Sequence, residues 1–162
     1  DRYSKGKPWD YDIINPGFNY RLDEIRASLG INQLKRINSL NSKRFLASKY
    51  YSKQLKEISG IITPEIFRKK EHTYHLYIIR IKNEFGQNRD EIFKELKKVG
   101  IQVSLHYKPL HRFSAYKHLT KTYGRLDNSE QIYKESLSLP LYPSISKKQQ
   151  DLVINSIKNY KV

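Results

Sequence analysis

Three neighbouring side chains near the start of the chain, Asn19, Tyr20 and Arg21, offer an amide, a phenol and a guanidinium immediately ahead of an amphipathic stretch. The first turn of a helix has backbone N–H groups without partners, and such groups bind anions. The segment therefore predicts an anion site. The residues also allow a simpler interpretation, in which Asn19 forms a turn or caps the helix and Arg21 pairs with Asp23 or Glu24.

A second cluster of polar and aromatic side chains begins at residue 106. Residues 101–106 alternate apolar and polar side chains, which is the period of a half-buried strand. His106, Tyr107 and His111 follow around a proline, and residues just past a strand often line binding sites. His106 could instead be a buried, hydrogen-bonded histidine and Tyr107 a core aromatic. The two histidines lack a third ligand at suitable spacing, so we expect no metal site.

A third group lies in residues 72–81, which are rich in aromatic and β-branched side chains and predict a strand. Strict alternation would place Thr73, His75 and Tyr77 on one face of it. We expect these side chains to pack in the core rather than to bind a ligand.

One long helical passage precedes these segments. Apolar residues recur at helical spacing from Leu22 onward, with bends expected at Gly30 and Asn41 and an end expected by Ser59–Gly60. Apolar residues continue this spacing along the passage: Ile25, Leu29, Leu34, Ile37, Leu40, Ala47, Tyr51 and Leu55. These positions predict the face that the helix buries.

The remaining elements predict a small α+β domain, in which a few strands are covered by helices. A helix should begin at Asn88 and end at Gly100, with inward residues Ile92, Phe93, Leu96 and Val99. Ser129 should cap a short helix that runs through Tyr133 and Leu137, and residues 139–143 should be extended. Ser146 should cap a final helix with inward residues Leu152, Val153 and Ile157.

The net charge of +15, from 31 Lys and Arg against 16 Asp and Glu in 162 residues, suits a nucleic-acid-binding protein. The basic residues are scattered, however, and no RNA-binding motif or recognition helix accompanies them. We therefore expect no nucleic-acid partner and keep a basic nucleic-acid-binding module only as a third alternative. A basic surface also suits substrates that carry a diphosphate.

The sequence contains no cysteine, no run of apolar residues long enough to cross a bilayer and no signal-peptide pattern. We expect a cytoplasmic protein without a membrane partner. The chain also contains no Met and begins at Asp1, which leads us to expect a fragment of a longer protein.

Four motifs, in this order and spacing, resemble the DegT-like (DegT/DnrJ/StrS) nucleotide-sugar aminotransferases, which use pyridoxal phosphate (PLP). They are G-F-N-Y-R at 17–21, H-T-Y-H-L-Y at 72–77, H-Y-K-P-L-H at 106–111 and S-L-P-L at 138–141. The resemblance begins near Trp9 and covers the rest of the chain. It implies the small C-terminal domain of a fold type I enzyme, with a largely antiparallel sheet. The run from His106 to Tyr116 is similar to that of the pseudaminic-acid pathway transaminases.

The resemblance also implies roles for individual residues. Asn19 and Arg21 would bind the cofactor, with Asn19 reaching the PLP phosphate of the neighbouring subunit of a homodimer. Tyr20 would contact the nucleotide-sugar substrate, as would the residues of the later motif, namely His106, Tyr107 and His111. No catalytic residue is expected in this chain, because the Schiff-base lysine belongs to the preceding domain and neither Lys5 nor Lys7 matches its motif.

The implied activity is transfer of an amino group, from glutamate, to a nucleotide-linked keto sugar in polysaccharide or surface-glycan biosynthesis. Residues 1–21 would be a linker that leaves the missing large domain, and 22–162 would form the small domain. We expect the fragment alone to be inactive. Two alternatives remain: an inactive remnant that binds a partner, and a dehydratase if histidine replaces the missing lysine.

Overall fold

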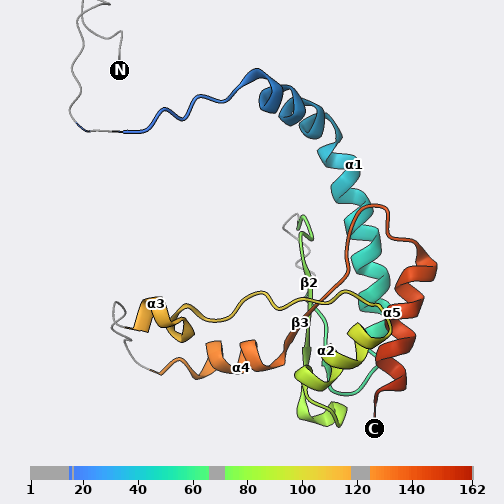
Figure 1. Cartoon of the computed structure of the whole chain (residues 1–162). Helices are drawn as coiled ribbons and strands as arrows, with labels where there is room; N and C mark the ends of the chain where they lie inside the picture. Colours follow the sequence, from blue (N-terminus) through green and yellow to red (C-terminus); the bar gives the residue numbers. More distant parts are fainter. Residues whose placement is uncertain (1–14, 16, 66–71, 118–124, 162) are drawn as a thin grey trace, which may run out of the picture. The chain divides into compact units, whose positions relative to one another are not determined.

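The computed structural model describes residues 15, 17–65, 72–117 and 125–161, which fall into two units, residues 1–36 and 37–162. A three-stranded antiparallel sheet, ordered β1-β2-β3, organises the second unit (Figure 1). The strands are β1 (Ile61–Ile62), β2 (Tyr77–Ile81) and β3 (Ser136–Leu139). The α-helices are α1 (Glu24–Leu55), α2 (Arg89–Lys98), α3 (Ser114–Lys117), α4 (Asp127–Glu135) and α5 (Lys147–Asn159). Two 3₁₀ turns complete the described elements, η1 (Asn83–Phe85) and η2 (Leu110–Arg112). The predicted α+β class is confirmed.

The central strand β2 has two different faces. Its register pairs Ile81 with Ile61 of β1 and Ile79 with Leu137 of β3. The side chains of Tyr77, Ile79 and Ile81 are buried, whereas the intervening residues are only partly covered. This alternation matches a sheet with its core mainly on one face.

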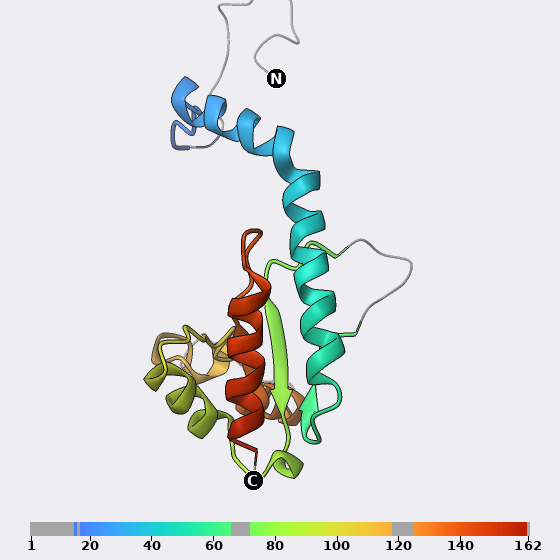
Figure 2. The ribbon, with the colours of Figure 1, turned by 90° about the vertical axis from the view of Figure 1, so that its right-hand side faces the viewer.

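Within the second unit, α5 and the C-terminal part of α1 cover one face of the sheet, and α4 lies on the other (Figures 1 and 2). Gln150 of α5 donates a hydrogen bond to the carbonyl of Ala47, at 2.9 Å. The hydroxyls of Tyr77 and Ser52 lie 2.8 Å apart, and burial raises the pKa of Tyr77 to about 12. Paired in this way, the polar groups enter the core without loss of their hydrogen bonds. The buried core comprises Tyr51, Leu55, Ile58, Ile61, Tyr77, Ile79, Ile81, Phe85, Ile92, Leu96, Ile101, Val103, Leu137, Leu139, Val153, Ile154 and Ile157.

Side chains cap two of the helices as predicted. Asn88 accepts hydrogen bonds from the N–H groups of Asp90 and Glu91, and the Glu91 side chain accepts one from the N–H of Asn88. Ser146 and Gln149 form the same reciprocal arrangement at the start of α5. Each of these capping boxes satisfies donors that a helix start leaves free.

The inward faces of these two helices are only partly as predicted. Ile92 and Leu96 of α2 are buried and Phe93 packs against the core, but Val99 is exposed. In α5 the side chain of Leu152 is 55% exposed, and Ile154 takes the buried position instead. The expected set Leu152, Val153 and Ile157 is therefore wrong at its first member.

The predicted strand over 72–81 is wrong in its first half, since β2 starts at Tyr77. Tyr74 has a φ of +46°, outside the range of an extended strand, and its N–H donates to Nδ1 of His72 at 2.8 Å. The alternation proposed for Thr73 and His75 therefore does not apply. Tyr74 and Tyr77 are nevertheless buried, in line with the expected packing role, whereas Thr73 and His75 are exposed, so the expected core packing is wrong for those two.

The second predicted strand, 101–106, is reduced to a single bridge between Ser104 and Ser138. Ile101 and Val103 enter the core, but the chain leaves the sheet after one pair of backbone hydrogen bonds. The prediction that Ser129 caps a helix is also wrong, because α4 begins at Asp127 and Ser129 lies inside it. Leu137 belongs to β3 rather than to that helix, so the chain is already extended at Ser136.

Helix α1 begins in the first unit at Glu24, close to the predicted start. It continues into the second unit and ends at Leu55, without a break at Gly30 or Asn41. Several of the predicted apolar positions are exposed, namely Leu22, Ile25, Leu29, Leu34 and Ile37, whereas Ala47, Tyr51 and Leu55 are buried as predicted.

Candidate substrate pocket

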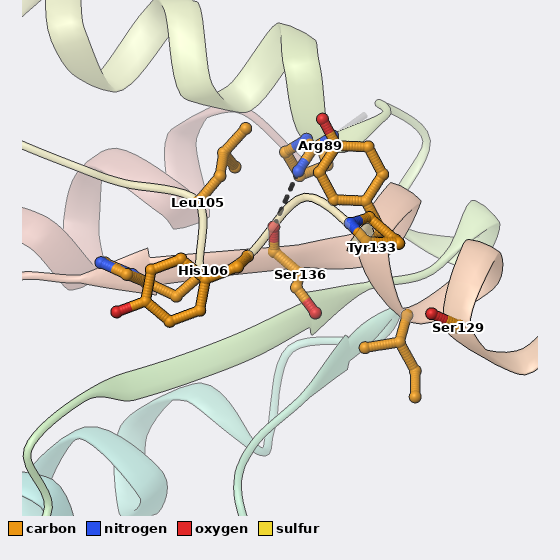
Figure 3. Close-up of a pocket in the computed structure, with 9 residues that line it drawn as sticks. Arg89, Leu105, His106, Ser129, Tyr133 and Ser136 are labelled. Carbon is orange, nitrogen blue, oxygen red and sulfur yellow. Dashed lines mark hydrogen bonds between the residues drawn. The ribbon is translucent and has the colours of Figure 1, made fainter. Parts of the chain in front are cut away.

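A pocket of about 350 Å³ opens in the second unit, on the side of the sheet that carries α4 (Figure 3). It lies between the segment that follows the Ser104 bridge, the first residue of α2, and α4. It is lined by Arg89, Leu105, His106, Tyr107, Pro109, Ser129, Ile132, Tyr133 and Ser136. This lining is largely apolar and aromatic, carries a few polar groups and contains no carboxylate, which suits a polar, uncharged or anionic ligand.

His106 and Tyr107, predicted from sequence as substrate residues, both line this pocket. Backbone pairing between Ser104 and Ser138 ends just before them, and His106 Nδ1 then lies 2.7 Å from the Oγ of Ser138. Their two rings meet edge to face, with centroids 4.7 Å apart. Tyr107 is 73% exposed, so it is not a core aromatic and its hydroxyl is available to a ligand.

Arg89 is the buried charge of the pocket, with 6% of its surface exposed. Its Nη1 donates to the carbonyl of Ser136 at 3.0 Å, and its Nε donates to Asp90 at 2.6 Å. The guanidinium lies 5.3 Å from the ring centroid of Tyr133, and Figure 3 shows the two side chains together, with the bond to Ser136 dashed. Arg89 therefore joins the start of α2 to the junction of α4 and β3.

Sequence reasoning missed Arg89 and the pocket residues of α4, Ser129, Ile132 and Tyr133. One signal was available, because a cation in the first helical turn is opposed by the helix dipole and needs another reason to be there. The α4 residues gave no such signal, since they come close to His106 only through the tertiary fold.

His111, the third predicted substrate residue of this motif, lies on η2 and is not part of the pocket lining. Its Nε2 is 2.5 Å from Oε1 of Glu130 on α4. Arg112 also binds both oxygens of Glu130. The hydrogen bonds from Arg112 and His111 lower the pKa of Glu130 to about 2, so the carboxylate is ionised at neutral pH.

Asn19, Tyr20 and Arg21 belong to the first unit, where all three are exposed. Oδ1 of Asn19 accepts a hydrogen bond from the N–H of Arg21 at 3.3 Å, an Asx-type turn that fits the simpler interpretation of Asn19. The amide nitrogen of Asn19 and the guanidinium of Arg21 remain on the surface, and both are donors suited to a phosphate. In donor chemistry these residues fit the phosphate of PLP.

The helix start itself is a poorer anion site than the sequence predicted. Asp23 accepts a hydrogen bond from the N–H of Arg26 at 2.9 Å and pairs with the Arg26 side chain at 3.1 Å. Glu24 adds a second negative charge to the first turn. A phosphate beside this segment would therefore depend on Asn19 and Arg21 rather than on the helix N–H groups.

The part of the chain that the structure describes holds neither a cluster of metal ligands nor a membrane-spanning helix. No group of three or more His, Cys, Asp and Glu side chains within those ranges is placed to hold a metal ion. None of the described helices has the length and apolar character needed to cross a membrane.

Comparison with known proteins identifies the family. Residues 2–158 match the model of the DegT/DnrJ/EryC1/StrS aminotransferase family. The UDP-4-amino-4,6-dideoxy-N-acetyl-beta-L-altrosamine transaminase of Campylobacter jejuni is 36% identical over 153 residues, covering 94% of this chain and 40% of that protein. The chain thus spans about 40% of the length of the curated relatives it matches.

Solved structures agree with this match. The Helicobacter pylori aminotransferase PseC, involved in the biosynthesis of pseudoaminic acid, superposes with a TM-score of 0.84 and 27% identity, over 97% of this chain and 42% of that one. A Streptococcus pneumoniae protein described as a sugar aminotransferase is 31% identical and has been solved in two cofactor forms. The PLP form superposes with a TM-score of 0.80 over 94% of this chain and 39% of that one. The PMP form superposes with a TM-score of 0.81 over 95% of this chain and 39% of that one. Aminotransferases of this family use PLP. The chain belongs to the DegT/DnrJ/EryC1/StrS aminotransferase family and corresponds to the C-terminal part of its members.

Proposed function

We propose that this chain is the substrate-binding C-terminal part of an aminotransferase that transfers an amino group from glutamate to a nucleotide-linked keto sugar. The family match, and a Campylobacter jejuni relative that is a sugar-nucleotide transaminase, support the reaction class. In the complete enzyme, PLP supplies the electron sink for amino transfer. We place the enzyme in the cytoplasm, as a homodimer, in polysaccharide or surface-glycan biosynthesis.

The observation that carries this proposal is the pocket on which His106 and Tyr107 converge. Its hydroxyl, imidazole and guanidinium groups can hydrogen-bond a polar sugar, and its aromatic walls can pack against the sugar ring. Tyr107 is more accessible than His106, because most of its surface is exposed whereas His106 is half-buried. In this proposal Tyr107 binds and orients the sugar, and His106 lines the pocket next to Tyr107.

The cofactor residues are assigned in the same way. Asn19 and Arg21 hold the PLP phosphate of the neighbouring subunit, and Tyr20 contacts the substrate there. Support comes from the exposed amide and guanidinium donors of this segment and from its match to the family motif. We propose that the Schiff-base lysine belongs to the large domain of the complete enzyme and that residues 1–162 alone do not transaminate.

The proposal is tested by replacing Tyr107 in a complete enzyme, that is, this chain joined to a large domain of this family that carries the cofactor lysine. Tyr107→Ala should raise the KM for a UDP-linked 4-keto sugar about tenfold or more, because a direct hydrogen bond and ring contact are lost. Leu110→Ala is the matched control, since Leu110 lies in the same segment, is 66% exposed and does not line the pocket. Equal KM values for the two variants would contradict the proposal.

A second candidate function is a partner-binding domain without catalysis of its own. The exposed apolar residues Leu22, just before α1, and Ile25, Leu29 and Leu34 within it favour this function, because an apolar stripe of this kind normally lies against another surface. The two candidates differ in a simple experiment. Addition of a separately expressed large domain should restore transamination if the first is correct, and should give binding without product if the second is.

A further inference from the structure

Tyr107 lies in a pocket-lining segment that runs from His106 to the short turn η2. At one end His106 is bonded to Ser138 of β3. At the other, η2 has two short-range backbone hydrogen bonds among the described residues, from Arg112 N–H to the carbonyl of Pro109 and from Phe113 N–H to that of Leu110. A turn this short has little stability in isolation, so contacts outside it must hold it in place.

Those contacts converge on one carboxylate, that of Glu130 on α4. Oε1 accepts from His111 Nε2 at 2.5 Å and from Arg112 Nε at 2.9 Å, while Oε2 accepts from Arg112 Nη2. An ionised carboxylate can only accept hydrogen bonds, so Nε2 is the protonated nitrogen of His111. Glu130 thus fixes two consecutive residues of η2 through charge-assisted bonds.

The same cluster reaches the pocket wall. The Arg112 guanidinium lies 5.2 Å from the ring centroid of Tyr133, which lines the pocket from α4 and also contacts Arg89. Glu130 is therefore shared by His111 and Arg112, and the Tyr133 ring is shared by Arg112 and Arg89. A network of this kind is more rigid than an isolated surface ion pair, whose contribution is commonly negligible.

We propose that Glu130 is a positioning residue, which acts through His111 and Arg112 to hold the segment 107–110 across the pocket so that Tyr107 meets the substrate. This inference rests on the proposed function, because it takes the pocket as the sugar site. It also gives His111 a role: it orders the binding segment from outside the pocket lining.

The first test uses the 162-residue chain itself and measures amide hydrogen exchange by NMR. In Glu130→Gln, the N–H groups of Arg112 and Phe113 should exchange about tenfold faster, because the charge-assisted bonds that hold η2 are weakened. The control is Glu95→Gln, which removes an exposed pair with Lys98 on α2. Unchanged exchange at Arg112 and Phe113 in Glu130→Gln would overturn the proposal.

The second test measures kinetics in the complete enzyme. Glu130→Gln should raise the KM for the keto sugar about tenfold and leave kcat within about twofold, because Glu130 does not line the pocket and acts only through His111 and Arg112. Glu130→Asp should restore part of the loss. A KM like that of the unmodified enzyme would overturn the positioning role.

Failure of the proposed function would look different. If Tyr107→Ala raises the KM but Glu130→Gln does not, the pocket is the sugar site and only the role of Glu130 is wrong. If neither variant changes the KM, the pocket is not the sugar site, and both proposals fall.

Discussion

His106 Nδ1 and Ser138 Oγ lie 2.7 Å apart, and this contact holds His106, which lines the pocket, against the buried strand β3. It follows directly on the backbone bridge between Ser104 and Ser138, so the side chain and the backbone of Ser138 both hold the segment. The orientation of the His106 ring therefore depends on β3.

Ser138→Ala should lower the free energy of unfolding by about 1 kcal/mol, because His106 loses its partner in a half-buried position. It should also raise the KM for the sugar in the complete enzyme. The measurement is urea denaturation, with Ser104→Ala as control, since Ser104 is exposed and contributes only its backbone to the bridge. Equal losses in the two variants would show that the side-chain bond to His106 contributes nothing.

Gly60→Ala should be among the most damaging small substitutions in the chain. Gly60 has a φ of +81°, and a Cβ built there would lie 2.2 Å from the backbone nitrogen of Phe85. We expect a loss of at least about 3 kcal/mol, from the left-handed backbone and the clash together. Gly100→Ala separates the two effects, because its φ is +77° but its Cβ would meet nothing within 4 Å. It should cost only about 1–2 kcal/mol, and a similar loss at both positions would contradict this account.

Gly60 and Asn88 are two separate positions at which the sequence predicts the local structure well, namely a turn after α1 and the start of α2. A glycine after a long apolar periodicity and an Asn three residues ahead of a Glu are local signals, and both mark real chain turns or helix starts. The helical and α+β character follow from such signals. The late start of β2 at Tyr77 has no such local signal, because Tyr74 leaves the extended conformation and its ring is buried by tertiary packing.

The candidate site was predictable only in part. His106 and Tyr107 stand in one motif, so the sequence could single them out. Arg89 of α2 and Tyr133 of α4 are 44 residues apart in the chain, and they meet at the pocket only through the tertiary fold. The link from His111 to Glu130 depends on the same tertiary packing, and no spacing in the sequence announces it.

Acid should weaken the fold partly through Glu130. Hydrogen bonds from Arg112 and then His111 lower its pKa from 4.5 to about 2, so the folded state favours the ionised form. The resulting stabilisation is fully present above pH 4.5 and is lost as the pH falls toward 2. The urea midpoint of the wild-type chain should exceed that of Glu130→Gln at pH 6, and the difference should shrink between pH 4.5 and 2. A difference that is independent of pH would contradict the assigned cause.

Asn19→Ala should weaken cofactor binding in the complete enzyme, because an exposed phosphate donor is removed. We expect the Kd for PLP, followed by the absorbance of the cofactor, to rise about tenfold. Asn32→Ala is the control, since Asn32 is also exposed and bonds only the helix carbonyl of Ser28 among the described residues. In mixed dimers, a subunit with Asn19→Ala should impair the active site of its neighbour rather than its own. Impairment confined to its own site would contradict the assignment in trans.

The central claim, that this chain is the substrate-binding part of a sugar aminotransferase, is tested most directly by assaying two proteins side by side: residues 1–162, and the same chain joined to a large domain of this family that carries the cofactor lysine. Each is incubated with PLP, glutamate and a UDP-linked 4-keto sugar, and the aminated sugar and 2-oxoglutarate are measured. We predict both products from the longer protein, whose added residues include the cofactor lysine, and neither from residues 1–162. Aminated sugar from residues 1–162 alone, or none from a longer protein that carries the lysine and binds PLP, would contradict the account.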